Sequence, residues 1–401
     1  MAGVERFRVA VPEATLDDLT ERLARTRWPG ALDGTGWEDG TSLAFLRDLV
    51  DWWQNGFDWR AQEAAINRFP QFRATVDGVG LHFVHVRGKG PAPLPLVLTH
   101  GWPSTFYELL PLVPLLTDPA GHGGDAADAF DVVIPSLPGY GFSDPLQGRG
   151  SANRVPQLWA TLMADVLGYR RFGAHGGDIG GMVANRLALE HPERLLGIHV
   201  TRAADPYVGP GAAPLTEAEQ ALLPARARWH EAEGGYAHLQ RTRPQSLAFG
   251  LADSPVGLAA WIVEKWRSWS DCDGEIERRF TKDQLLTTVM LYWVTGTIAS
   301  SFRFHRDWAL GAASLPEALT VALADRDEVP AGVVRPLGRD ERIQVPAAVA
   351  LFDYPCPREW AERAYGDLRR FTDMPRGGHF TAMEEPELLA QDLRVFFRAL
   401  R

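Results

Sequence analysis

The chain has 401 residues, with 41 Lys and Arg against 51 Asp and Glu, and a net charge of -10. This length allows one large or two ordinary domains with a sizeable core. The 45% hydrophobic content is typical of a soluble globular protein, and the acidic balance disfavours a nucleic-acid or anionic-membrane partner.

The N-terminus and the cysteines indicate the cellular compartment. The first twenty residues contain Glu5, Asp17 and Asp18 and no long apolar core, so we expect neither a signal peptide nor a membrane anchor. Cys272 and Cys356 lie far apart without metal-ligand spacing. A reduced, cytoplasmic chain without a metal site is the simplest interpretation.

The first predicted segment, residues 1–75, is helical and aromatic. Thr15 with Asp18 resembles a helix N-cap pair that opens a first helix. Residues 42–53 repeat the apolar helical pattern, and residues 60–68 form a third short helix. We attribute the aromatic residues here to packing.

A β-hairpin follows. Residues 72–76 and 81–86 flank residues 77–80, whose sequence is a strong turn signal. His82 and His85 are three apart on one strand and therefore point to opposite faces, so they cannot chelate one metal ion. We interpret both as ordinary sheet residues.

Strands and helices then alternate. The predicted strands are 94–99, 130–135, 172–174 and 195–200, and the predicted helices between them are 106–116, 155–167 and 182–189. This alternation predicts a mostly parallel sheet covered on both faces.

The alternation stops after residue 200 and resumes near the C-terminus. Helical patterns without strands occupy residues 217–233, 254–268 and 281–305, residues 308–343 form an irregular return segment, and strands at 345–352 and 371–374 precede a closing helix at 387–400. We predict an α/β fold with an inserted helical lid. Its divisions are an N-terminal segment (1–75), a first core part (76–205), the lid and return segment (206–343) and a second core part (344–401).

The stretch His175–Gly181, with Asp178 at its centre, links a short buried strand to a helix. Small residues on both sides of Asp178 suit a tight, strained turn that leaves no room for Cβ atoms. The pattern small-x-nucleophile-x-small is the nucleophile elbow of α/β-hydrolases. A carboxylate at its apex attacks carbon and forms an ester that water must hydrolyse. The alternative is a glycine-rich turn in which the aspartate caps the helix.

An elbow nucleophile needs a base and an orienting acid that follow it in sequence. His379 lies in a glycine-flanked loop after the last predicted strand, which is the position expected for the base. Asp353 directly follows the 345–352 strand and is our choice for the acid, with Glu359 and Glu362 as alternatives.

The same topology predicts an oxyanion hole and a donor for the leaving group. Backbone N–H groups of Trp102 and Ile179 would hold the oxyanion. An epoxide oxygen needs acidic hydrogen-bond donors, whereas a halide needs Trp or Asn N–H donors. Tyr236, after two glycines in the lid, is a suitable phenol, although packing of the lid is the alternative role.

These motifs together resemble the microsomal-type epoxide hydrolases over almost the whole chain. The matching segments are Asp58–Arg60, His100–Ser104, Gly176–Asp178, Gly235–Gln240, Asp253–Ala260, Leu291–Ile298 and Pro375–Phe380. The resemblance implies a soluble bacterial member with an α/β-hydrolase core, a helical lid and an N-terminal segment that wraps both. It also implies hydrolysis of epoxides to vicinal diols without metal or cofactor, and a cis bond between Trp102 and Pro103.

Two residues depart from the family pattern. The family usually has Trp after the nucleophile, where this chain has Ile179. The second ring-opening tyrosine of the family corresponds to His305, which donates one hydrogen bond when neutral and two when charged. His305 could replace the phenol, with a pH dependence near neutrality. The alternatives are that Tyr236 acts alone or that the chemistry is altered.

We therefore predict a hydrolase for a small-molecule epoxide that is hydrophobic or polycyclic, bound by Trp102, Pro103 and Tyr236. Asp178, His379, Asp353, Tyr236 and His305 are the predicted catalytic residues. One rival is a haloalkane dehalogenase, and another is a biosynthetic relative that binds or cyclises an epoxide without hydrolysis. The sequence leaves the oligomeric state open, with a homodimer as one alternative.

Overall fold

The computed structural model describes residues 3–148, 151–309 and 337–401, without the side chains of Ser151, His305, Trp308 and Ala309. Nine strands in these ranges form one sheet in the order β1-β2-β3-β5-β4-β6-β7-β8-β9. The strands are β1 (Val4–Phe7), β2 (Gln71–Val76), β3 (Val79–Val86), β4 (Leu94–Thr99), β5 (Phe130–Pro135), β6 (Phe172–Gly176), β7 (Leu195–Val200), β8 (Ala347–Leu351) and β9 (Leu368–Asp373).

The sheet is parallel from β5 to β9 and antiparallel from β1 to β3, with β3 antiparallel to β5. The β2–β3 turn has positive φ at both central residues, Asp77 (46°) and Gly78 (80°). Such a turn matches the twist of the flanking strands. The predicted hairpin is confirmed, and its two histidines take different partners: His82 bonds Ser136 and Gln71, and His85 bonds Tyr169.

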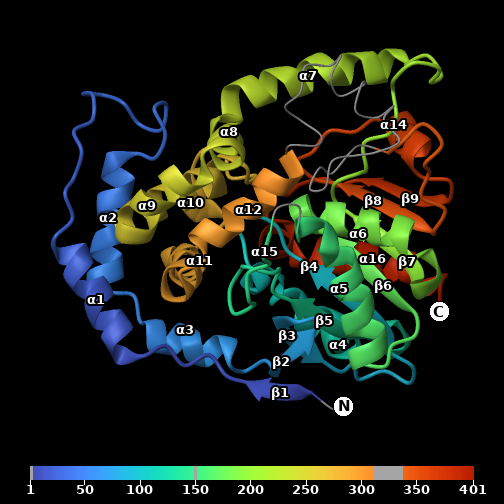
Figure 1. Cartoon of the computed structure of the whole chain (residues 1–401), viewed down its shortest axis with the longest axis horizontal. Helices are drawn as coiled ribbons and strands as arrows, with labels where there is room; N and C mark the ends of the chain where they lie inside the picture. The colour runs from blue at the N-terminus through green and yellow to red at the C-terminus, as the bar shows by residue number, and fades with distance from the viewer. Residues whose placement is uncertain (1–2, 149–150, 310–336) are drawn as a thin grey trace.

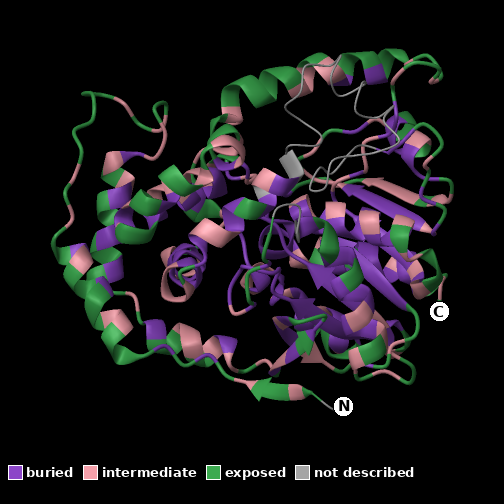
Figure 2. Cartoon of the chain, in the orientation of Figure 1, coloured by how far each residue is buried: buried purple, intermediate pink, exposed green. Residues whose placement is uncertain are grey.

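Helices cover both faces of the parallel part, which confirms the predicted α/β fold. They are α4 (Leu112–Thr117), α5 (Val155–Thr161), α6 (Asp178–Glu190), α14 (Arg358–Ala364), α15 (Thr381–Glu384) and α16 (Pro386–Arg398). Figure 1 shows α5 and α6 in front of the sheet and α16 behind it. Figure 2 shows the buried residues concentrated in the sheet and on the helix sides that face it.

Two of the helices predicted within the α/β core are interrupted. The single helix expected at 106–116 is wrong: residues 106–109 form a 3-10 turn, and α4 begins only after Pro111, which has no N–H to donate to a continuous helix. The helix expected at 155–167 continues from α5 as a π-helical turn over Leu162–Val166.

The lid lies between β7 and β8 in the chain. Its helices are α7 (Glu217–Glu233), α8 (Gly235–Thr242), α9 (Pro244–Asp253), α10 (Pro255–Ser268), α11 (Lys282–Thr295) and α12 (Ile298–Ala309). Gly296, with φ 63°, ends α11 and divides the predicted 281–305 helix in two. Most of the predicted return segment lies outside the described residues.

The N-terminal segment links the sheet to the lid. β1 pairs with β2 at the edge of the sheet, whereas α1 (Glu13–Ala24) and α2 (Leu43–Asn55) lie beside the lid and α3 (Trp59–Ile66) leads back to the sheet (Figure 1). The Trp52 indole donates to Asp283 of α11 at 2.7 Å. The expected N-cap at Thr15 is wrong, because α1 begins two residues earlier, after Pro12.

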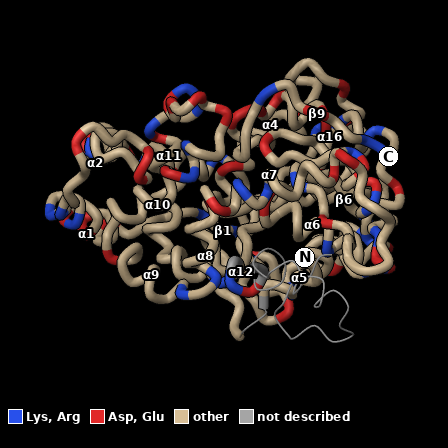
Figure 3. Tube along the Cα trace, turned by 90° about the horizontal axis from the view of Figure 1, so that it is seen from above, with Lys and Arg blue, Asp and Glu red and all other residues tan. Residues whose placement is uncertain are grey.

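Charged residues of both signs are interspersed along the trace (Figure 3). Among the described helices, none taken singly has the length and apolar composition needed to cross a membrane. The division at residues 75, 205 and 343 stays a prediction.

Candidate active site

The elbow has the strained geometry that its glycines indicated. Asp178, the first residue of α6, has φ 46°, which is rare for a residue with a side chain. A Cβ on Gly177 would lie 2.5 Å from the Thr201 hydroxyl, and one on Gly180 would lie 1.9 Å from the Thr99 carbonyl oxygen. The turn therefore requires glycine on both sides of the aspartate.

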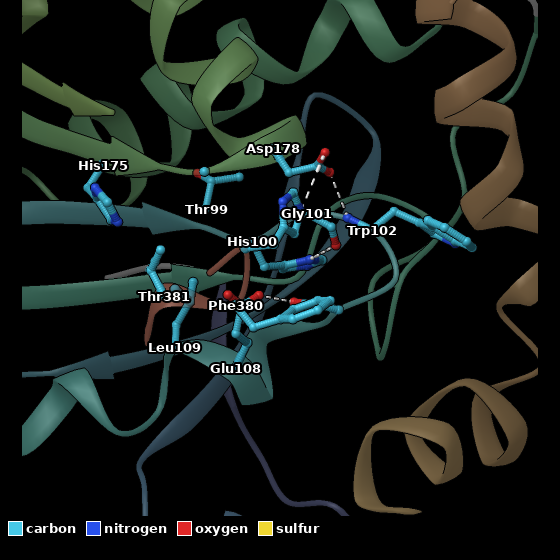
Figure 4. Close-up of a pocket in the computed structure, with 13 residues that line it drawn as sticks. Thr99, His100, Gly101, Trp102, Glu108, Leu109, His175, Asp178, Phe380 and Thr381 are labelled. Carbon is cyan, nitrogen blue, oxygen red and sulfur yellow. Dashed lines mark hydrogen bonds and ion pairs between the residues drawn. The ribbon is translucent and has the colours of Figure 1, made fainter. Parts of the chain in front are cut away.

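The loop after β4 approaches the Asp178 carboxylate directly. The Trp102 N–H donates to Asp178 Oδ1 at 2.9 Å, as Figure 4 shows, and the Trp102 indole points away from the carboxylate. A Cβ on Gly101 would lie 2.5 Å from the same oxygen, so this approach depends on glycine. The Trp102–Pro103 bond is cis, as the resemblance implied.

His379 reaches the elbow from the loop after β9. Its Nδ1 is 2.7 Å from Asp353 Oδ2, and its Nε2 is 3.9 Å from Asp178 Oδ2. Asp353 lies just beyond β8, whereas the alternative acids Glu359 and Glu362 lie on α14, where Glu362 pairs with Arg358. The structure thus brings together the three residues chosen from the sequence.

Electrostatics favour the charged form of the imidazole. Burial opposes protonation of His379, but Asp353, by charge and hydrogen bond, and then Asp178 and Glu108 raise its pKa from 6.5 to about 9. A neutral Asp178, as in an ester, would remove one of these charges and lower the pKa of His379.

The His379 loop is held by carboxylates that sequence reasoning missed. Glu384 of α15 accepts the N–H groups of Gly378 and Phe380 and also that of Asp271 in the lid. The His379 N–H donates to the Trp269 carbonyl at 2.9 Å. The only sequence signal was an acidic pair, residues 384–385, shortly after the histidine.

Tyr236 lies on α8, above the Trp102 loop. Its ring stacks on Trp102, with centroids 5.1 Å apart and planes within 4°, and meets the Trp269 ring edge-on at 5.0 Å. Burial and the charge of Asp178 raise the pKa of the Tyr236 phenol, so it stays protonated at neutral pH. It can therefore donate a proton or a hydrogen bond.

The remaining predicted site residues are placed as follows. Pro103 is buried, and its carbonyl accepts from the Trp266 indole at 3.3 Å. Ile179 is buried in the first turn of α6, and the role of its N–H stays a prediction. The backbone of His305 lies in α12, but its side chain lies outside the described residues, so its expected role also stays a prediction.

Comparison with known proteins decides the family. The model described as epoxide hydrolase N terminus matches residues 4–109, and that described as alpha/beta hydrolase fold matches residues 95–250. Epoxide hydrolase 1 of Sus scrofa is 34% identical over 426 residues, which cover 99% of this chain and 89% of the pig protein. The chain belongs to the epoxide hydrolase family.

Further relatives confirm the resemblance drawn from the motifs. A Stigmatella aurantiaca protein, provisionally named an epoxide hydrolase, is 41% identical over 100% of this chain and 86% of its own length. The Aspergillus niger epoxide hydrolase structure has a TM-score of 0.81 at 28% identity and covers 100% of this chain and 97% of that one. The whole chain is therefore an epoxide hydrolase fold, with the predicted α/β core and lid.

Two buried histidines of this epoxide hydrolase, His100 and His175, are held neutral. His100 Nε2 accepts the Leu137 N–H at 3.1 Å, so the ring proton is on Nδ1, 3.0 Å from the Gly101 carbonyl. Burial lowers the pKa of His100 to about 4. His175 pairs with His199 inside the sheet, and burial together with His199 lowers the pKa of His175. Both rings line the cavity beside Asp178 and His379.

Glu108 is a further carboxyl group at the site that the sequence analysis did not single out. It lies in the 3-10 turn after β4 and lines a small cavity together with Asp178 and His379. A lone acidic residue in an apolar run was its only sequence signal. Within the described ranges, no group of three His, Cys, Asp or Glu side chains could hold a metal ion.

Proposed function

We propose that this protein hydrolyses a hydrophobic epoxide to a vicinal diol through a covalent ester on Asp178. The supporting observation is the line of groups at the elbow: a carboxylate bonded to the Trp102 N–H, with His379 beside it and Asp353 behind His379. Each group is suited to one step of a two-step hydrolysis.

In the first step, an Asp178 carboxylate oxygen attacks an epoxide carbon and the ring C–O bond breaks. The epoxide oxygen takes the proton of Tyr236, whose raised pKa keeps that proton available. His305 is our proposed second donor, and its replacement by tyrosine is expected to keep activity and move the pH optimum.

In the second step, His379 Nε2 takes a proton from water, and the water oxygen bonds to the ester carbonyl carbon of Asp178. The Trp102 N–H, and by proposal that of Ile179, donates to the resulting oxyanion. Collapse breaks the bond between the carbonyl carbon and the diol oxygen, and this oxygen takes the remaining water proton from the Asp178 carboxyl group. Asp353 orients His379 and stabilises the imidazolium.

Loss of the Asp178 charge links the two steps. In the free enzyme, the pKa of His379 near 9 leaves mostly imidazolium, which is a poor base. Formation of the ester neutralises Asp178 and lowers that pKa, so the imidazolium gives its proton to the Tyr236 phenolate and the neutral imidazole becomes a base when one is needed.

Aromatic side chains around Tyr236 support a hydrophobic substrate. Trp102 and Trp269 contact its ring, and both are largely buried. The relatives with solved structures include the juvenile hormone epoxide hydrolase of Bombyx mori, with a TM-score of 0.79 at 28% identity over 99% of this chain and 94% of that one. We propose an apolar epoxide as the substrate of this chain.

A single turnover in ¹⁸O-labelled water, with enzyme in excess, tests the ester. The expected diol carries an unlabelled oxygen from Asp178, and the label enters the Asp178 carboxylate. A diol labelled in this first turnover would overturn the proposal. Halide release from chloroalkanes would favour the dehalogenase rival, and a cyclised product without diol would favour the biosynthetic one.

Other features of the sequence stay predictions. They are the cytoplasmic location, the homodimer and the division of the chain at residues 75, 205 and 343. The proposed chemistry depends on none of them.

A further inference from the structure

The cavity beside the elbow has the size of a water molecule. Its volume is about 20 Å³, and a buried water needs roughly 10–15 Å³ of such space. The polar groups that line it include Thr99, His100, Ser104, Glu108, Asp178 and His379.

A buried water also needs two to four polar partners, and the lining offers them. The side chains of Asp178 and His379 line the cavity, and so does Glu108 from the 3-10 turn after β4. Figure 4 shows Asp178 and Glu108 among the lining residues. The ester carbonyl carbon would form at Asp178. A water held here therefore lies next to both its base and its target.

Glu108 has no structural partner that explains its position. Its described hydrogen bond is a short one from the Ser104 hydroxyl, and no Lys or Arg pairs with it among the described residues. A partly buried carboxyl group without a cation costs stability, because removal from water disfavours its charged form. The proposed steps above give it no role.

We propose that this cavity holds the hydrolytic water and that Glu108 positions it. This inference rests on the proposed ester mechanism. The Glu108 carboxylate accepts one hydrogen of the water, and His379 Nε2 accepts the other. His379 takes its proton as the water oxygen bonds to the ester carbon, and the bond to the diol oxygen then breaks as that oxygen takes the second water proton. Glu108 keeps its hydrogen bond to the remaining O–H and gains no proton.

Neighbouring groups act on Glu108 in both directions. Burial, together with the charges of Asp178 and Glu384, raises the pKa of Glu108 to about 7 against the opposing effects of the Ser104 hydroxyl and His379. Ester formation removes the Asp178 charge that raises this pKa, and the neutral form of His379 lacks the charge that lowers it, so the two changes oppose each other. The positioning role of Glu108 therefore follows from the shared cavity and not from a change in its charge.

The test is Glu108→Gln, which keeps the side-chain volume and removes the charge. With enzyme in excess, mass spectrometry of quenched samples follows the ester on Asp178. We expect ester formation at the wild-type rate and ester hydrolysis slowed by ~10- to 100-fold, the range that loss of positioning produces. In steady state, kcat and KM should fall together while kcat/KM holds, because kcat/KM reports ester formation.

A purely structural role would give a different result. It would slow both steps or lower only the melting temperature. Either outcome, or ester hydrolysis at the wild-type rate, would overturn the positioning role. Glu359→Gln is the matched control, because it removes one carboxylate from exposed α14 and should change neither step.

Ser104→Ala decides the question if Glu108→Gln does not fold. It removes the hydroxyl that bonds Glu108 and keeps the carboxylate. We expect the same step to slow by a few-fold, and an unchanged rate would contradict the inference. His379→Gln separates the ester mechanism from the positioning role of Glu108. If this variant forms no ester on Asp178 from a substrate that the wild type turns over, the ester mechanism itself is wrong.

Discussion

The Asp353→Asn variant tests the link between the acid and the base. Asn keeps the shape of Asp353 but carries no charge, and the wild-type carboxylate lies 2.7 Å from His379 Nδ1. The rise in the pKa of His379 from 6.5 to about 9 corresponds to roughly 3 kcal/mol of net preference for imidazolium. Asp353 is the largest favourable contribution to this rise, and burial opposes it.

Without Asp353, burial should dominate and the pKa of His379 should fall by at least one to two pH units, on the order of what one close carboxylate contributes. The neutral imidazole is the base, so activity rises as the pH passes this pKa. We expect the rising limb of kcat to move to lower pH. We also expect a lower plateau, by roughly 10²- to 10⁴-fold, because an amide no longer fixes the tautomer or stabilises the imidazolium.

The assay is kcat against pH together with the amount of ester at each pH. Ester formation needs Asp178 and Tyr236, so ester should accumulate in Asp353→Asn. Glu362→Gln is the matched control, because this alternative acid pairs with Arg358 on α14. Two results would refute the electrostatic coupling between Asp353 and His379. One is a lower maximal kcat whose pH dependence does not move to lower pH, and the other is a kcat equal to that of the wild type.

Three further predictions concern the donor, the elbow and the sheet. Tyr236→Phe should lower kcat/KM by roughly 10²-fold with little change in melting temperature, because only the proton donor is lost; an unchanged kcat/KM would remove this phenol from the mechanism. Gly180→Ala should lower the free energy of unfolding in urea by about 1–3 kcal/mol or more, because the added Cβ would lie 1.9 Å from a backbone oxygen. Gly250→Ala is the control, since the space around its Cβ is open and no destabilisation is expected. Asp392→Asn should lower the free energy of unfolding by about 3–5 kcal/mol, because Asp392 is 3% exposed and bonds both His199 and Arg370. Asp367→Asn removes a carboxylate from an exposed ion pair and should lower it by less than about 1 kcal/mol. Equal losses of stability in the two variants would contradict the burial argument.

Several elements could be predicted because their signals are local. Strands 94–99, 130–135 and 195–200 have the predicted bounds, since each is a short apolar run between turn residues. The elbow is equally local: the glycines around Asp178 are required within a few residues of one strained backbone position.

Other features depend on which distant segments meet. Pro111 was visible in the sequence, yet the break between the 3-10 turn and α4 follows from packing as well as from the missing N–H. Glu384 joins the His379 loop to the lid residue Asp271, which lies 113 positions before Glu384 in the sequence. No periodic pattern in the sequence predicts such a contact.

By itself, the sequence determined the candidates for the nucleophile and its base, the α/β core and the inserted lid. Those features depend on residue type at short spacing and on the fixed order of strand, acid and histidine. Only the tertiary structure decided that Asp353 rather than Glu359 or Glu362 meets the imidazole, and that Glu108 shares a water-sized cavity with Asp178. The physical reason is that hydrogen bonds and pKa values depend on distances of a few ångströms, which are set when segments far apart in the chain pack together.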